Sequence, residues 1–336
     1  MKLLNLFGRY DARLIAAAAE GDVEGVKRAL KHANPNAKNV GDASMFFENT
    51  PRNEDTAIMA AARLGHAECV RILASVSDLQ EQHNTKWESA LHLAADGSHV
   101  DCVNALLETP QADYLCRMMT LHRSDTALGL AAERGHAECV KALLPMSNAN
   151  KLNGEGRTPL CLAVSAGFDR AIECVEMLAP CTAFPSLADI HPNEHGKRPQ
   201  VDPLAEAVAA ENAEMAALLA PLYSQRGQRD CVNPSLGLAV ALMKNRQGGQ
   251  WALSGEAAHQ GWALADMLAF HAEEAFADKC LAEVGAGCMP RWCAHQEQIA
   301  LSRIVEEGRS SKAERSIGGE AISSIAPSAG ARSRRL

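Results

Sequence analysis

The chain has 336 residues and a formal net charge of −8 at pH 7. Apolar residues make up 47% of it but aromatic residues only 4%, a composition that suits closely stacked helices better than one wide globular core. The negative charge argues against specific nucleic-acid binding, and no segment has the 18 or more apolar residues that a membrane span requires. The 11 cysteines follow no disulfide-framework spacing, so we expect a reducing, cytoplasmic environment.

The predicted helices come in pairs that repeat along the chain. The hexapeptide Gly-His-Ala-Glu-Cys-Val occurs at 65–70 and again at 135–140, and a diverged copy of the same unit lies midway, at 89–107. A period of 33 to 35 residues with two short Ala- and Leu-rich segments indicates stacked helical repeats. In chain order, the first helices of the units open at Ala12, Thr56, Ser89, Thr126, Thr158 and Asp202.

Each unit carries the signals of a helix, a tight turn and a second helix. Threonine or serine openers fit N-caps, whose side-chain oxygen accepts a hydrogen bond from a backbone N–H at the start of the helix. Paired alanines such as Ala131 and Ala132 lie on the buried stripe of the first helix and let neighbouring units approach closely. A glycine after the helix fits a chain that turns back in a left-handed conformation. Nine residues after the openers stand Gly21, Gly65, Ser98, Gly135, Gly167 and Glu211.

These units resemble ankyrin repeats. Residues 153–167 read NGEGRTPLCLAVSAG and contain the Asn-x-x-Gly-x-Thr-Pro-Leu opening of that family. Leu91-His92 supplies the Leu-His of another unit, and residues 33–36 resemble the family's loop after the second helix. The resemblance covers about residues 12–222, six units of which the first and last are degenerate. It implies an all-α, ankyrin-type helical repeat solenoid over 1–222.

Three places depart from the regular length of such units. The connections at 31–55 and 180–201 are longer than usual, and the region 171–173 lengthens one second helix. Insertions of this kind project from one face of a repeat stack, often the face that binds a partner.

After residue 222 the repeat pattern fades. We predict a helical extension over 223–307 that caps the stack, because an exposed apolar end needs cover; degenerate repeats are the alternative. Ser, Gly, Ala and Arg dominate residues 308–336, where we predict a disordered basic tail. Within the extension, four segments fit helices, and the first two also fit degenerate units: 233–245, 252–268, 271–284 and 293–307.

Cysteine recurs at one position of the repeat. Equivalent positions of stacked helices lie about 8–10 Å apart, whereas a disulfide needs Cα atoms within about 7 Å and zinc needs sulfurs about 2.3 Å from one point. We therefore expect small core residues rather than a metal or redox ladder. The recurring cysteines are Cys69, Cys102, Cys139 and, after a short insertion, Cys174.

Histidine follows the turn glycine in two units, as His66 and His136, each two residues before a glutamate. A catalytic acid–base pair is needed once in a protein, whereas a structural residue is needed in every unit. We therefore expect these imidazoles to bridge backbone groups of neighbouring loops, and we place His92 in the same class.

One cluster lies outside the repeats. Cys280, Cys288, Cys293 and His295 fall within sixteen residues and include the ligand types of structural zinc sites. Their spacing lacks a Cys-x-x-Cys pair, so we favour a turn in which buried cysteine and Trp292 pack against the last helices, with a zinc site as the alternative.

The ankyrin resemblance places partner contacts on the finger loops and on the C-terminal ends of the first helices. Together these positions form a ridged concave surface of mixed charge, which suits a polar protein interface better than a closed catalytic pocket. We expect charge reversal of Arg63, Glu133 and Arg134 together to abolish partner capture without lowering thermal stability. The predicted partner-binding residues are Arg52, Asn53, Arg63, Leu64, Lys86, Glu88, Asp96, Arg123, Glu133, Arg134, Glu155 and Arg157.

The chain contains no phosphate-binding, nucleophile-elbow or metalloprotease motif, so we predict no catalytic residue, cofactor, metal or small-molecule substrate. Our first hypothesis is a non-enzymatic module that binds another protein. The alternative makes the array a targeting arm for a small effector or enzymatic domain at 223–307. A secreted effector would use the same binding mechanism; the first residues, MKLLNLFGRYD, lack a complete signal-peptide core.

Overall fold

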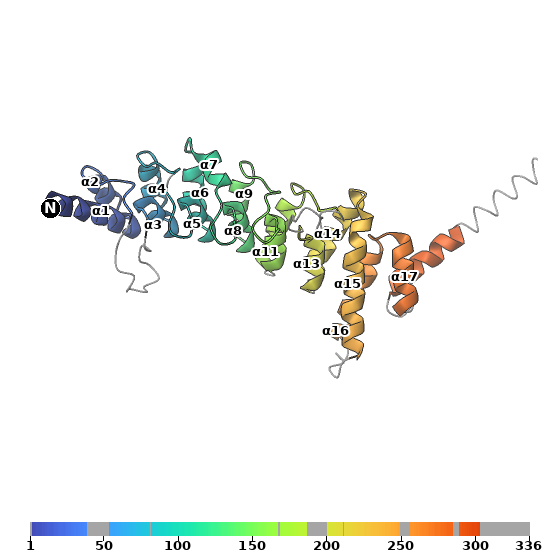
Figure 1. The fold of residues 1–336 in the computed structure, drawn as a ribbon. Helices are drawn as coiled ribbons and strands as arrows, with labels where there is room; N and C mark the ends of the chain where they lie inside the picture. The colour runs from blue at the N-terminus through green and yellow to red at the C-terminus, as the bar shows by residue number, and fades with distance from the viewer. Residues whose placement is uncertain are drawn as a thin grey trace, which may run out of the picture.

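A computed structural model describes residues 2–38, 54–80, 82–166, 169–186, 200–210, 212–248, 256–284 and 289–302. Within these ranges the chain is helical, and the one extended pairing is an isolated antiparallel bridge between Lys38 and Thr56. The helices stack in two rows away from the N-terminus (Figure 1). The predicted all-α repeat solenoid is confirmed.

One row contains the first helix of each unit, and each packs on the first helix of the next. These helices are α1 (Lys2–Glu20), α3 (Ala57–Arg63), α5 (Ala90–Asp96), α8 (Ala127–Glu133), α10 (Pro159–Ala166) and α13 (Pro203–Ala209). The second helices pack on one another in the same order. They are α2 (Val23–Ala29), α4 (Ala67–Ala74), α6 (Val100–Leu107), α9 (Ala137–Leu143), α11 (Asp169–Leu178) and α14 (Ala213–Gln225).

The turns between the two helices of a unit lie where the sequence predicts them. Gly21, Gly65 and Gly135 have φ of 74°, 80° and 69°, and Ser98 takes the same left-handed conformation at 62°. A Cβ on Gly65 would lie 2.6 Å from Nδ1 of His99, so both the dihedral and the neighbouring ring require glycine there. Gly167 and Glu211 lie outside the described residues.

The histidines that follow these turns join successive units. Nε2 of His66 lies 2.9 Å from the carbonyl oxygen of Ala19, and Nε2 of His136 lies 3.0 Å from that of Asp96. The expected bridging role is confirmed. His99 makes the same contact, 3.0 Å from the carbonyl oxygen of Arg63; it was missed because serine replaces the glycine before it.

The N-caps differ among units. Thr126 Oγ1 accepts from the backbone N–H of Gly129 at 3.2 Å, as predicted. The Thr56 side chain does not cap α3; its hydroxyl donates to Oε1 of Gln82 at 2.7 Å. The predicted opener Ala12 is also wrong, since α1 already begins at Lys2. Residues 2–11 contain no proline and one glycine, so nothing in them ends a helix.

Small residues fill the space between the units. Ala94, Ala95, Ala131 and Ala132 are fully buried. The repeated cysteines are buried too, and burial raises the pKa of Cys102 to about 12 and that of Cys139 to about 11, which keeps them as unreactive thiols. The expectation that they are core residues is confirmed, for Cys69 and Cys174 as well.

A helix that the sequence analysis missed lies in the connection after α6. The helix α7 (Ala112–Arg117) packs on α6 through buried Ala112, Leu115 and Cys116, and it lies beyond α6 on the edge of the stack (Figure 1). It accounts for the long interval between the openers Ser89 and Thr126. The longer second helix predicted around 171–173 is confirmed by α11, which has 10 residues.

Past residue 222, which lies within α14, the packing of the array continues. The helix α15 (Arg229–Gly248) packs on α13, and α16 (Glu256–Ala269) packs on both α14 and α15. The segment 233–245 and the described part of 252–268, which begins at 256, therefore each belong to one long helix of a single pair, rather than to a unit of its own. The helix α17 (Glu274–Val284) packs on α15, and a last helical segment covers 290–302. The predicted tail at 308–336 lies outside the described residues.

A polar and aromatic cluster joins the fifth unit to the sixth. The Tyr223 ring stacks on Phe184 with centroids 4.2 Å apart, and Cζ of the Arg226 guanidinium lies 4.3 Å from the centroid of the Phe184 ring. The Tyr223 hydroxyl donates to the buried carboxylate of Asp202, which also accepts from the N–H of Ala205 at 3.0 Å and so caps α13. Burial raises the pKa of Asp202.

Candidate partner-binding surface

The structure places the predicted partner-binding residues in different environments. Arg52 and Asn53 lie outside the described residues. Arg63 faces inward: its Nε and Nη2 donate to the two carboxylate oxygens of Asp55 at 2.9–3.1 Å, with Asp55 fully buried and the Arg63 side chain only 16% exposed. The expectation that charge reversal at Arg63 leaves thermal stability unchanged does not fit this burial.

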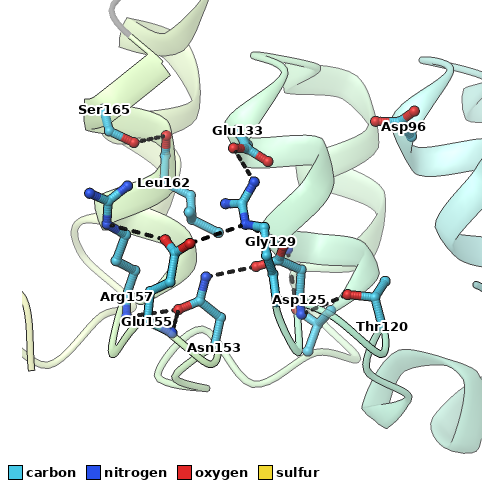
Figure 2. Close-up of polar contacts among 12 residues, drawn as sticks. Asp96, Thr120, Asp125, Gly129, Glu133, Asn153, Glu155, Arg157, Leu162 and Ser165 are labelled. Atoms are coloured by element: carbon cyan, nitrogen blue, oxygen red, sulfur yellow. Dashed lines mark hydrogen bonds and ion pairs between the residues drawn. The ribbon is translucent and has the colours of Figure 1, made fainter. Parts of the chain in front are cut away.

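Four other predicted residues form a chain of alternating charges across two units, and Glu206 extends it into a third; Figure 2 shows Glu133, Glu155 and Arg157 of this chain. Arg123 Nη1 donates to Glu133 at 2.7 Å, and its Nε lies 3.7 Å from Glu155. Arg157 Nε lies 3.8 Å from Glu155, and its Nη2 lies 2.9 Å from Glu206 in the next unit. The mixed charge of the surface is therefore largely neutralised within the array.

The exposed pair is Arg134 with Asp96. Arg134 Nε lies 2.9 Å from Asp96 Oδ1 in the preceding unit, and the two side chains are 59% and 45% exposed. A pair this open to solvent is screened and exchanges readily with a partner's charges. Leu64, which follows α3, is half-buried.

The loop before each first helix is a finger: residues 82–88, 118–125 and 150–157. Asparagine fixes the shape of two of them. Asn84 Oδ1 accepts the N–H groups of Lys86 and Glu88 at 2.9 and 3.1 Å, and Asn84 Nδ2 donates to Glu88 at 2.8 Å. Asn153 repeats this arrangement, and its Nδ2 donates to Asp125 at 2.8 Å (Figure 2). These hydrogen bonds hold the fingers 82–88 and 150–157 in their shape without a partner.

The sequence analysis missed an apolar groove between two fingers and α7. Its cavity has a volume of about 560 Å³. The backbone N–H of Leu121 donates to the carbonyl of Lys86 at 2.9 Å and so joins the two fingers. Four large apolar side chains are unusually exposed there: Trp87 50%, Tyr114 40%, Met119 36% and Leu121 53%. The groove is lined by Trp87, Tyr114, Arg117, Met118, Met119, Thr120, Leu121 and Ser124.

Trp87 also has an unusual backbone. It stands two residues before its helix opener, a position that is left-handed in successive fingers, with φ of 68° at Glu54, 61° at Trp87, 55° at Ser124 and 79° at Gly156. Glycine adopts this conformation freely, whereas a bulky residue does so at a cost. The sequence signal that could have revealed this groove was therefore a tryptophan, Trp87, at the finger position where another finger has a glycine, Gly156.

The repeat geometry agrees with a comparison to known protein families. A family model described as ankyrin repeats (3 copies) matches residues 14–118, 113–189 and 129–230, together well over half of the chain. The chain belongs to the ankyrin repeat family. Ankyrin repeats generally mediate protein–protein interactions, and ankyrin repeat proteins are typically non-enzymatic interaction modules.

A curated relative matches part of this chain. It is a zinc finger CCCH domain-containing protein from Oryza sativa subsp. japonica, number 24 of that series, 34% identical over 98 residues. The match covers 28% of the present chain and 13% of the relative, so the present chain spans only a small part of the length of that protein.

The C-terminal Cys/His cluster does not assemble in the described part of the ankyrin protein. Cys288 lies outside the described residues, and no three His, Cys, Asp or Glu side chains within them could hold one metal ion. The His295 ring packs 5.2 Å from Phe270 and 5.6 Å from Trp292. Trp292 and Cys280 are buried, as the favoured interpretation predicts.

The last helical segment is fixed by two acids. The Asp266 carboxylate accepts the backbone N–H groups of Arg291 at 3.0 Å and Trp292 at 2.8 Å, and Trp292 Nε1 donates to Asp278 at 3.0 Å. These bonds tie 289–302 to α16 and α17. Among the described residues, no helix is both long and apolar enough to cross a lipid bilayer.

Proposed function

We propose that this ankyrin protein binds a partner protein, without catalysing a reaction, through its fingers and the adjoining ends of its first helices. The observation that carries the proposal is the gathering of four half-exposed apolar side chains, Trp87, Tyr114, Met119 and Leu121, on two neighbouring fingers and the adjacent helix α7. Exposed apolar clusters with a polar rim are typical of interaction sites on soluble proteins.

The order of the fingers also supports this function. Asn84 and Asn153 fix the finger backbones, and Arg123 and Arg157 join three units through carboxylates. A surface ordered in advance loses little conformational entropy on binding, so more of the contact energy contributes to affinity. The charges that neutralise one another would act as a polar rim around the apolar residues rather than as the main source of affinity.

The C-terminal helices support an interaction protein rather than a targeting arm with an enzymatic domain. The helix α15 packs on α13 and α16 packs on α14, in the order in which earlier units pack on one another. The described residues therefore extend the array. We further propose a cytoplasmic location, since the buried cysteines at the repeat position lie separately in the core as free thiols.

Affinity capture from an extract of the source cells, followed by mass spectrometry, tests the proposed function. The bait is the full chain as wild type, as Arg134→Glu at the C-terminal end of the first helix α8, or as Lys141→Glu on the second helix α9. Lys141 is the matched control, because it is 69% exposed on a second helix and also has an acidic neighbour, Glu138. We expect a partner that wild type and Lys141→Glu capture and Arg134→Glu loses in part. Equal capture by all three baits would contradict a contact at the end of this first helix. A failure to capture any protein specifically would contradict the proposed function itself.

A further inference from the structure

The apolar groove has the geometry of a site for one kind of partner segment. We propose that it binds an extended stretch of the partner protein that inserts one large apolar side chain, with an aspartate or glutamate close to it in sequence. This inference rests on the proposed function and names the chemistry that the fingers recognise.

The walls of the groove favour a peptide over a small molecule. A small-molecule site normally covers most of the ligand surface. Here Trp87 and Leu121 are themselves 50% and 53% exposed, so they stand as ridges with solvent on their outer sides. A peptide chain that crosses the ridges would cover these outer sides as well as fill the volume of about 560 Å³ between them.

The lining selects a large apolar side chain. Trp87 and Tyr114 offer aromatic faces, and Met118 and Met119 offer flexible, polarisable side chains. Aromatic rings prefer offset or edge-on contacts with other rings, and methionine adapts its shape to the group that enters. A leucine, methionine or aromatic residue of the partner would thus bury apolar surface on both sides of the groove.

The charge of the rim selects an acidic neighbour. Arg117 is the charged residue of the lining, and its ion pair with Asp113 is open to solvent, with the two side chains 70% and 67% exposed. Lys86 is adjacent to two residues of the lining. It directly precedes Trp87 in the chain, and its backbone carbonyl accepts a hydrogen bond from the N–H of Leu121. Its side chain is exposed and makes no ion pair within the described part of the chain.

Tryptophan at this left-handed position is a second observation in favour of binding, because the conformation recurs in the other described fingers and does not itself require a tryptophan. A left-handed tryptophan is a strained residue, and strain at such positions clusters in ligand-binding segments. Packing does not account for it, since half of the side chain is exposed and its ring contact is a stack on the partly buried His83 with centroids 4.7 Å apart. The strained finger instead presents the indole beside Leu121 and Tyr114.

A displayed library of random linear peptides, selected on the full-length protein, tests the proposal. The affinities of selected peptides are then measured by fluorescence anisotropy. Leu121→Ser is compared with Val76→Ser, because Val76 is 52% exposed after α4 and away from the groove lining. Arg117→Glu is compared with Arg71→Glu, whose arginine also pairs with an acid within its helix.

We expect the selected peptides to share a large apolar residue with an acid within a few positions. Leu121→Ser should weaken their binding about tenfold or more, and Arg117→Glu about fivefold at low salt with a smaller effect at high salt. Val76→Ser and Arg71→Glu should leave binding unchanged.

Three results would overturn the proposal: no selected peptide at all, peptides that bind Leu121→Ser as tightly as wild type, or apolar peptides without the acid. A wild-type dimer in light scattering that Leu121→Ser converts to a monomer would also overturn it, because a second copy would then occupy the groove. If Leu121→Ser still captures the cellular partner fully, the proposed function stands and the groove is not the site.

Discussion

The pair of Arg63 with Asp55 allows a quantitative prediction, because the same side chain was predicted to contact a partner. Arg63 donates three hydrogen bonds of 2.9–3.1 Å to a carboxylate that is fully buried, and its own side chain is only 16% exposed. Removing one member of a buried pair typically costs about 3–5 kcal/mol. Since the guanidinium retains some solvent contact, we expect Arg63→Ala to lower the free energy of unfolding by about 3 kcal/mol, the lower end of that range.

The matched control is Arg134→Ala. Arg134 also stands at the end of a first helix and pairs with an aspartate at 2.9 Å, but this pair is 59% and 45% exposed, so its loss should cost less than about 1 kcal/mol. Urea unfolding followed by circular dichroism at pH 7 measures both values. A double-mutant cycle with Asp55→Asn should give a coupling energy of at least about 1 kcal/mol. Equal costs for the two arginine variants would refute the assignment of Arg63 to the scaffold.

Further predictions concern stability measured in the same way. Trp87→Gly should be more stable than Trp87→Ala by about 1 kcal/mol, the reverse of the usual order, because the position is left-handed; the usual order would show that Trp87 is not strained. Ala94→Leu should cost about 1–3 kcal/mol through overpacking, whereas leucine at the exposed Ala16 should change little. Tyr223→Phe should cost about 1–3 kcal/mol, because the buried Asp202 carboxylate loses a donor. Burial raises the pKa of Asp202, so its contribution is fully present below the ordinary value near 4 and is lost as pH rises through the raised one. Wild type should therefore lose stability relative to Asp202→Asn over that interval, and parallel pH profiles would contradict this.

The repeated features could be predicted from the sequence, because each occurs in several repeat units. The turn glycines, the paired alanines, the core cysteines and the bridging histidines all occupy fixed positions after the openers, so chance resemblance in one unit is corrected by the others. His99 shows the limit of this approach, since Ser98 adopts the glycine conformation at φ 62° and hides the motif.

The candidate site could not be predicted in the same way, because it depends on features that occur once. The helix α7 fills one connection only, and without it Tyr114 and Arg117 cannot be placed beside Trp87. Charge pattern alone also does not distinguish Arg63 from Arg134; the difference lies in the exposure of their aspartate side chains, which is 0% for Asp55 and 45% for Asp96. Periodicity therefore predicts the scaffold, while the irregular connections decide the surface.

Site-specific photo-crosslinking tests most directly the claim that the fingers bind the partner. A photoreactive amino acid replaces Leu121 in one protein and Val76 in another, positions that are 53% and 52% exposed, and each protein is irradiated with the captured partner. The account predicts a covalent adduct with the partner from position 121 and none from position 76. An adduct from position 76 without one from position 121 would contradict it.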